Sequence, residues 1–253
     1  MTATSAAGVA PWMPNLGADQ SRHFAIAKSA PPAEQLEVLG VLRRPQVSAD
    51  RGEQATYALR FFGGTVRTDY VRVLSEPDDT QGAAVLVPVT EYRPRERAGV
   101  DREASHPLAR DGLCLFVRDA VDGGAQGCYS LADVTAGRIR GALGDGRTAT
   151  VFGVVPDGVA SVRLRHPDGR STIVPVRDNF YLYKAGDGLR FEALEWLDAS
   201  GSALKSQEGM NISAPQPDDI VSQYCDDGRV VESRFDEDGD AACRRARRAA
   251  NGR

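Results

Sequence analysis

The chain has 253 residues, of which 42% are hydrophobic and 26% are charged, and its formal net charge is −4. This composition is ordinary for a globular protein, and the length allows one large domain or one domain with extensions. The weakly acidic balance argues against a nucleic-acid partner. No stretch reaches the roughly 18 apolar residues of a membrane-spanning helix, so no membrane span is expected in this chain.

The N-terminal part of the sequence predicts a lead-in followed by two helices. Residues 1–30 combine small residues and prolines without periodicity, which predicts a flexible N-terminal segment. A helix is expected from Ala33 to Arg44, because leucines recur at three-residue spacing between two prolines. A second helix is expected over 49–62, with an apolar face that ends at a glycine pair.

Strands and one long loop are expected next. Strands are expected over 70–74, 84–90 and 113–118, because apolar side chains alternate along these segments or form short runs in them. The charged, proline-broken segment 91–111 between them predicts a long loop, and long loops often carry function. A short helix is expected over 131–136, since Ser130 and Asp133 have the spacing of a capping box.

Residues 148–183 predict consecutive neighbouring strands, a meander, separated by Pro-Asp-Gly turns. Apolar side chains alternate with polar ones around Val162, as in a half-buried strand. Pro175 interrupts a later strand, which predicts an edge position or a bulge. Residues 191–197 have apolar side chains on both faces, which favours a central strand.

These patterns predict an α+β fold. The fold is expected to be mainly antiparallel β-sheet or sandwich, with two N-terminal helices and a small disulfide-stapled C-terminal extension. The expected organisation is a flexible segment over 1–30, a β-rich core domain over 31–205, and a polar C-terminal extension over 206–253.

Four cysteines, Cys114, Cys128, Cys225 and Cys243, allow three pairings. Pairing between sequence neighbours gives Cys114 with Cys128 and Cys225 with Cys243. The first bridge would close a hairpin of about 15 residues and stabilise it by roughly 3 kcal/mol. Free buried thiols remain an alternative. Metal binding or a catalytic thiol is poorly supported, because the chain has no C-x-x-C motif and its three histidines are scattered.

One segment of the sequence is a candidate for catalytic chemistry. The nucleophile elbow, the H-E-x-x-H motif, the phosphate-binding loop and the dinucleotide fingerprint are all absent from the sequence, and no cofactor is expected. The glycine-rich run 123–127 predicts a turn rather than a phosphate cradle. His106 and Asp111, in the 91–111 loop, are the one place where a histidine and an aspartate lie close together.

The C-terminal tail carries two charge clusters. Asp236, Glu237, Asp238 and Asp240 surround Gly239, but an EF-hand register would place arginines at its first and twelfth positions, so a full EF-hand is excluded. A weaker calcium site stays open, and the preferred interpretation is that the acids cap a helix that begins near Asp240. The arginines at 244, 245, 247 and 248 are interpreted as a solvated face of that helix.

The segments 112–130, 151–183 and 39–52 resemble a family of uncharacterised actinobacterial proteins. Members of that family look like exported or membrane-anchored proteins with one extracytoplasmic β-rich domain. The resemblance covers about residues 34–198, implies an extracytoplasmic location and supports the Cys114–Cys128 pair. The chain departs from it in showing no leader and in its tail after about residue 205, so a leader or anchor removed from this chain is one expectation and a cytoplasmic protein the other.

The leading functional hypothesis is a non-enzymatic, secreted or cell-surface module that binds a protein partner or self-assembles. The alternatives are a hydrolase that uses the 91–111 loop and the sensor domain of a membrane-anchored regulator.

Overall fold

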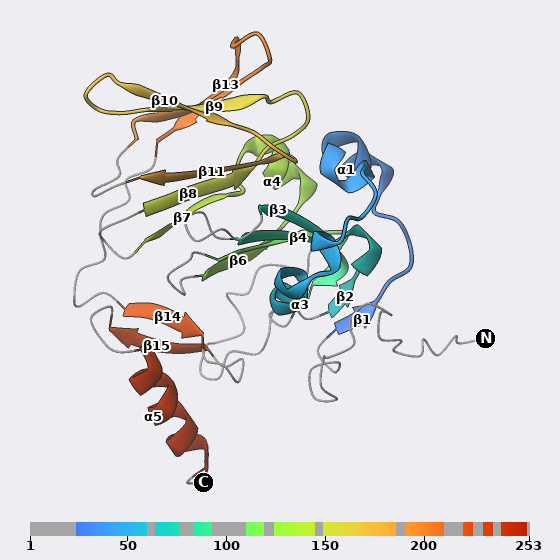
Figure 1. Ribbon diagram of the computed structural model, residues 1–253, viewed down its shortest axis with the longest axis vertical. Coiled ribbons are helices and arrows are strands. Elements are labelled where there is room, and N and C mark those ends of the chain that lie inside the picture. The colour runs from blue at the N-terminus through green and yellow to red at the C-terminus, as the bar shows by residue number, and fades with distance from the viewer. Residues whose placement is uncertain are drawn as a thin grey trace.

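The computed structural model describes residues 24–59, 64–75, 83–92, 110–118, 124–144, 149–185, 191–209, 220–224, 230–234 and 239–251. Three β-sheets are stacked one above another, with short helices beside and below the stack, and a small strand pair with a C-terminal helix lies at the opposite end from the outermost sheet (Figure 1). The expected α+β fold with predominantly antiparallel sheet is therefore confirmed. No helix in the described ranges is long and apolar enough to cross a membrane.

The first sheet has six strands in the order β1-β2-β4-β5-β6, with β3 also paired to β4. Its strands are β1 (Phe24–Ile26), β2 (Gly64–Val66), β3 (Arg72–Ser75), β4 (Ala83–Tyr92), β5 (Leu113–Arg118) and β6 (Gly124–Tyr129). β1 pairs in parallel with β2, so the end of the segment predicted to be flexible is part of the sheet. β6 includes Gly124 to Gly127, so the glycine-rich run is strand there and the predicted turn is wrong for these residues.

The N-terminal helices are shorter than expected. The predicted helix over 33–44 is two pieces, α1 (Ala33–Val38) and α2 (Gly40–Arg43), because Leu39 between them has an extended backbone. The predicted helix over 49–62 is a 3-10 turn, η1 (Ala49–Arg51), followed by α3 (Glu53–Leu59); residues 60–63 lie outside the described chain. A second 3-10 turn, η2 (Thr68–Tyr70), precedes β3.

The segment 148–183 is not a meander. Its four strands are β8 (Ala149–Val154), β9 (Ser161–Arg165), β10 (Ser171–Pro175) and β11 (Phe180–Ala185). β8 pairs with β11 and with β7 (Arg140–Gly144) to form the middle sheet, whereas the β9–β10 hairpin leaves that sheet and joins another. The prediction failed because period-2 alternation shows that a strand has two faces but does not show which strand lies beside it.

The outermost sheet has the order β10-β9-β12-β13, with β12 (Ala193–Leu197) and β13 (Ala203–Glu208). Pro175 lies on the edge strand β10, and β12 lies between β9 and β13, as predicted for both strands. β13 runs past the expected boundary at 205 and was not foreseen as a strand. We call the β10-β9-β12-β13 sheet the outer sheet.

Three apolar clusters fill the spaces between the layers. The first lies under α3 and includes Val85, Val87 and Val89 of β4. The second includes Ala84 and Leu86, from the opposite face of β4, and it joins the first sheet to the middle sheet. The third lies between the middle and outer sheets and includes Leu194 and Trp196. β4 is thus buried on both faces.

Helix α4 (Leu131–Ala136) matches its prediction. Ser130 and Asp133 form the complete capping box, with the Ser130 hydroxyl accepting from the Asp133 N–H and the Asp133 carboxylate accepting from the Ser130 N–H. Gly137 ends the helix in the left-handed region at φ 74°. A Cβ at this glycine would also displace the end of the Gln207 side chain of β13, but the left-handed backbone is the main reason for glycine here.

The disulfide between Cys114 and Cys128 is present, as predicted. The two residues lie directly opposite each other in the β5–β6 ladder, and Cys114 is fully buried. Cys243 is also disulfide-bonded, and Cys225, its predicted partner, lies outside the described residues.

The C-terminal part consists of the hairpin β14 (Ile220–Tyr224) and β15 (Val230–Arg234), followed by helix α5 (Gly239–Asn251). The helix begins one residue before the predicted start near Asp240, and it packs against both strands of the hairpin. The hairpin itself was not foreseen.

Candidate functional site

The one described residue of the weak catalytic candidate, Asp111, is held in an ion pair. Its carboxylate lies 2.5 Å from Nη2 of Arg67, whose guanidinium is almost fully buried and also donates to the Val89 carbonyl at 2.8 Å. The Asp111 carbonyl accepts from Nε2 of the buried Gln35. Asp111 takes φ 52°, a left-handed conformation that is uncommon for a residue other than glycine.

In this arrangement the Asp111 carboxylate compensates the charge of Arg67. An arginine left buried without a counter-charge is costly, and the Asp111 carboxylate supplies that charge. Nε of Arg67 and Oε1 of Gln35 are two of the buried side-chain atoms that have no hydrogen-bond partner among the described residues. His106 and the rest of 93–109 lie outside the described residues, so the hydrolase alternative stays a prediction.

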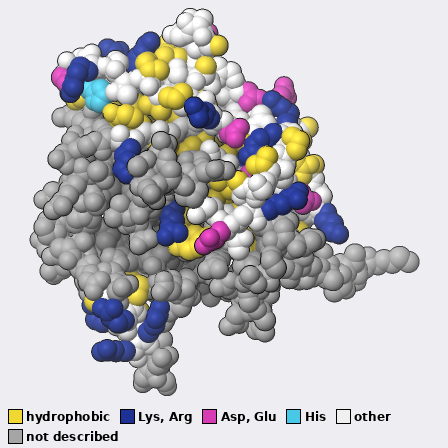
Figure 2. Space-filling model, in the orientation of Figure 1, with side chains coloured by type: hydrophobic (Ala, Val, Ile, Leu, Met, Phe, Trp, Pro, Cys, Tyr) yellow, Lys and Arg dark blue, Asp and Glu magenta, His cyan; other side chains and the backbone are white. Residues whose placement is uncertain are grey.

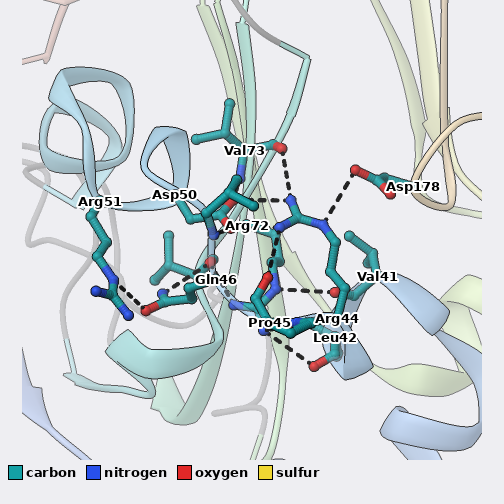
Figure 3. Close-up of polar contacts among 12 residues, drawn as sticks. Val41, Leu42, Arg44, Pro45, Gln46, Asp50, Arg51, Arg72, Val73 and Asp178 are labelled. Carbon is teal, nitrogen blue, oxygen red and sulfur yellow. Dashed lines mark hydrogen bonds and ion pairs between the residues drawn. The ribbon is translucent and has the colours of Figure 1, made fainter.

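A second polar cluster joins the N-terminal helices to β3 (Figure 3). Arg44 donates to both oxygens of Asp50 at 2.6 and 3.0 Å, and Asp50 is completely buried. The same carboxylate accepts from the backbone N–H groups of Val47 and Val73 at 2.9 and 2.8 Å. Nε of Arg44 lies 3.4 Å from the carboxylate of Asp178 on the turn before β11.

Burial raises the cost of ionising Asp50, but its four donors outweigh that cost. The hydrogen bonds from Arg44 and from the two backbone amides hold the pKa of the Asp50 carboxyl below its ordinary value. Asp50 is therefore charged in the folded protein, and its role is to hold the loop before α3 against β3.

Arg72 fills the centre of this cluster and is 2% exposed. Its guanidinium donates only to backbone carbonyls, those of Val41, Leu42, Arg44, Asp69 and Val71, at 2.8–3.3 Å. Burial lowers the pKa of this arginine. Because the carbonyls come from α2, from the residues after it and from the 3-10 turn before β3, Arg72 fixes three backbone segments at once (Figure 3).

A third polar cluster explains why the first helix is broken. The Gly40 N–H donates to Oδ1 of Asp157 at 2.8 Å, and the Val41 N–H donates to Oδ1 of Asn179 at 2.9 Å. These are the first two amides of α2, which have no partner within the helix. Asp157 also pairs with Arg43 at 2.6 Å. Side chains from the middle of the chain thus cap a new helix start after Leu39.

The outer sheet carries the best candidate for an interaction surface. Its inner face supplies the third apolar cluster, and among the described elements none lies over its outer face (Figure 1). Only three large hydrophobic side chains in the described chain are strongly exposed, and two of them, Ile173 at 53% and Leu204 at 54%, belong to this sheet. The third, Val47 at 51%, lies in the loop between α2 and η1.

Charged side chains lie between these two apolar positions. Ile173, Arg163, Glu195 and Ser206 are direct neighbours in one row across the four strands. Arg163 pairs with Glu195 at 2.8 Å, and Arg165 reaches the same carboxylate at 3.4 Å. Figure 2 shows hydrophobic and basic side chains intermixed over this sheet at the top of the molecule.

The predicted basic face is placed on α5. Arg244, Arg245 and Arg248 are exposed, and Arg247 is half-buried. Figure 2 shows basic side chains gathered over this helix at the bottom of the molecule. Arg244, Arg245 and Arg247 each make further contacts, so the helix is not a row of uncommitted cations.

Most of the acidic tail cluster lies outside the described residues. Residues 235–238 are not described, and Asp240 lies in the first turn of α5. Among the described side chains, no group of three metal-ligating residues is brought together. The calcium alternative stays a prediction.

Comparison with family models, with curated proteins and with solved structures gives no match for this chain. The resemblance to exported or membrane-anchored actinobacterial proteins therefore remains a prediction from the sequence.

Sequence reasoning identified β9 as half-buried but missed the surface that it helps to form. The signal was partly present, since Arg163 and Arg165 alternate with buried Val162 and Leu164. The exposure of Ile173 and Leu204 had no local signal, because it depends on which face of the sheet is left uncovered.

Proposed function

We propose that this chain is a non-enzymatic binding or assembly module that works outside the cytoplasm, and that the outer face of the outer sheet is its contact surface. The observation that carries the proposal is the exposure of Ile173 and Leu204 on the two edge strands of that sheet. An apolar side chain on each edge strand of the sheet, with a charged pair between them, offers a protein partner both apolar and polar contacts.

The disulfides support the location. Structural disulfides persist in oxidising compartments and are rare in the cytosol, and here one bridge joins buried Cys114 to Cys128 while Cys243 is bonded as well. The buried ion pairs support a structural use of the charged residues. Arg44, Asp50 and Arg72 hold backbone segments together, and Asp111 neutralises Arg67.

Crosslinking in the native cell tests the contact surface. A photoreactive amino acid is placed at Ile173 or at Leu204, and Val47 serves as the matched control because its exposed fraction is nearly the same. Adducts from the two outer-sheet positions, with none from position 47, are expected. Equal adducts from all three positions, or none from the outer sheet, would refute the assigned surface.

The location is tested separately by trapping thiols in acid-quenched cells and measuring the intact mass after alkylation. Cys114 and Cys128 are expected to escape alkylation until a reductant is added. Alkylation of both residues without reductant would place the chain in a reducing compartment and contradict the proposal.

A further inference from the structure

We infer that the outer face of the outer sheet binds a second copy of this chain, through a two-fold axis that runs parallel to the strands between β9 and β12. The inference rests on the proposed function and names the partner of the same surface. A two-fold contact requires a surface that is complementary to itself, and the strand order β10-β9-β12-β13 provides one.

The axis exchanges the strands in pairs. With strands about 4.8 Å apart, rotation about a line midway between β9 and β12 places β9 over β12 of the second copy and β10 over β13. Rotation about an axis parallel to the strands keeps each row of residues at the same height. The row that contains Ile173, Arg163, Glu195 and Ser206 therefore faces the same row of the second copy in reverse order.

The charges on this row complement each other after the exchange. Arg163 of one copy faces Glu195 of the other, and the reverse pair forms on the far side of the axis. Within one copy Arg163 and Arg165 share the single carboxylate of Glu195, so the β9 side of the face carries excess positive charge. Glu208 is exposed on β13, one strand beyond the position that Arg165 of the second copy takes.

The apolar side chains also approach each other after the exchange. Ile173 on β10 faces β13 of the second copy beside Ser206. Leu204 lies on that strand two residues before Ser206, at the bulge where β12 and β13 change register. The two-fold axis therefore places Leu204 of one copy about two residues, roughly 6–7 Å, along the strand from Ile173 of the other. This approach occurs once on each side of the central charge pairs.

The small size of the face favours a weak interaction. Four strands of about five residues span about 19 by 17 Å, or roughly 300–400 Å² per copy. Stable complexes bury about 800 Å² per partner. We therefore expect a reversible dimer whose dissociation constant lies between about 10 μM and 1 mM.

Sedimentation velocity of the purified chain tests the inference over about 10 μM to 1 mM, the range in which such a dimer forms. The weight-average sedimentation coefficient of the wild type is expected to rise with concentration. Ile173→Lys and Leu204→Lys are each expected to weaken association at least about tenfold, since each buries an unpaired charge. Val47→Lys, the matched control, is expected to associate like the wild type.

A charge exchange makes the test specific for the geometry. Arg163→Glu alone and Glu195→Arg alone each place like charges across the axis, so neither variant is expected to self-associate. An equimolar mixture of the two restores both cross-axis pairs and is expected to associate. This result needs no restored pair within either copy, so a folding defect in the single variants cannot produce it.

Two results would overturn the inference: a wild type that stays monomeric up to about 1 mM, or a mixture that fails to associate while the wild type does. The crosslinking experiment separates this failure from that of the proposed function. If Ile173 and Leu204 crosslink to a different protein while the wild type stays monomeric, the proposed dimer is rejected but the binding surface is retained. If the two positions give no crosslinks and the wild type is monomeric, both proposals are rejected.

Discussion

Replacing Asp50 by asparagine tests whether the buried cluster around Asp50 stabilises the fold. Asparagine keeps the size of the side chain but removes its charge and turns one acceptor oxygen into a donor. Each oxygen of Asp50 accepts one backbone N–H and one Arg44 N–H, so the oxygen that becomes an NH2 group leaves one donor of each kind without its acceptor. An unpaired buried N–H costs about 1–3 kcal/mol and a lost charge-assisted bond about 1.5–3 kcal/mol.

Together these losses predict that Asp50→Asn lowers the free energy of unfolding by about 3–5 kcal/mol, the range found when one partner of a buried ion pair is removed. Urea-induced unfolding followed by circular dichroism measures the change, with the m-value expected to stay constant. Arg170→Ala is the control, because the Arg170 side chain is 81% exposed in its pair with Asp168, and no resolvable change is expected. A loss below about 1 kcal/mol for Asp50→Asn would refute the reasoning.

Three further predictions concern the disulfide, the helix cap and acid stability. Replacing Cys114 and Cys128 together by alanine should lower the free energy of unfolding by about 3 kcal/mol, measured against the oxidised wild type, and an unchanged value would contradict a bridge that constrains the unfolded chain. Ser130→Ala should cost about 1 kcal/mol, with Ser130→Asn close to the wild type since asparagine also caps, and equal losses for the two would argue against capping. The pKa values of Asp50 and Asp157 are both lowered; for Asp157, hydrogen bonds from Asn179, Arg43 and Gly40 outweigh the effect of burial. The two carboxylates therefore contribute fully to stability above about pH 4, and this contribution is lost as the pH falls below that value. The free energy of unfolding, measured from about pH 6 to pH 2, should fall in the wild type and should fall less in Asp50→Asn. Parallel pH curves for the two proteins would contradict the assigned role of Asp50.

Features with local causes were predictable from the sequence. The capping box of α4 needs only Ser130, Asp133 and Gly137, all within eight positions of the chain. The β5–β6 hairpin aligns Cys114 with Cys128 through a short connection, so sequence-local pairing gave the right bridge.

Features with distant causes were not predictable. The break at Leu39 depends on Asp157 and Asn179, which contact Gly40 and Val41 across 117 and 138 positions of sequence. β13 has no apolar alternation, because it is an edge strand whose residues are mostly exposed, so its paired state depends on β12. The candidate surface was missed for the same kind of reason, since Ile173 looks like an ordinary strand residue until the uncovered face is known.

The middle sheet has no side that faces solvent along β8. Phe152 and Val154 pack into the cluster shared with the first sheet, whereas Val151 and Val155 pack into the cluster shared with the outer sheet. β11 is divided in the same way, with Phe180 on one side and Tyr181 on the other. Separation of either neighbouring sheet would expose half of the middle one to water. The stack should therefore unfold in one cooperative transition rather than sheet by sheet, and β8, like β4, should tolerate substitution poorly.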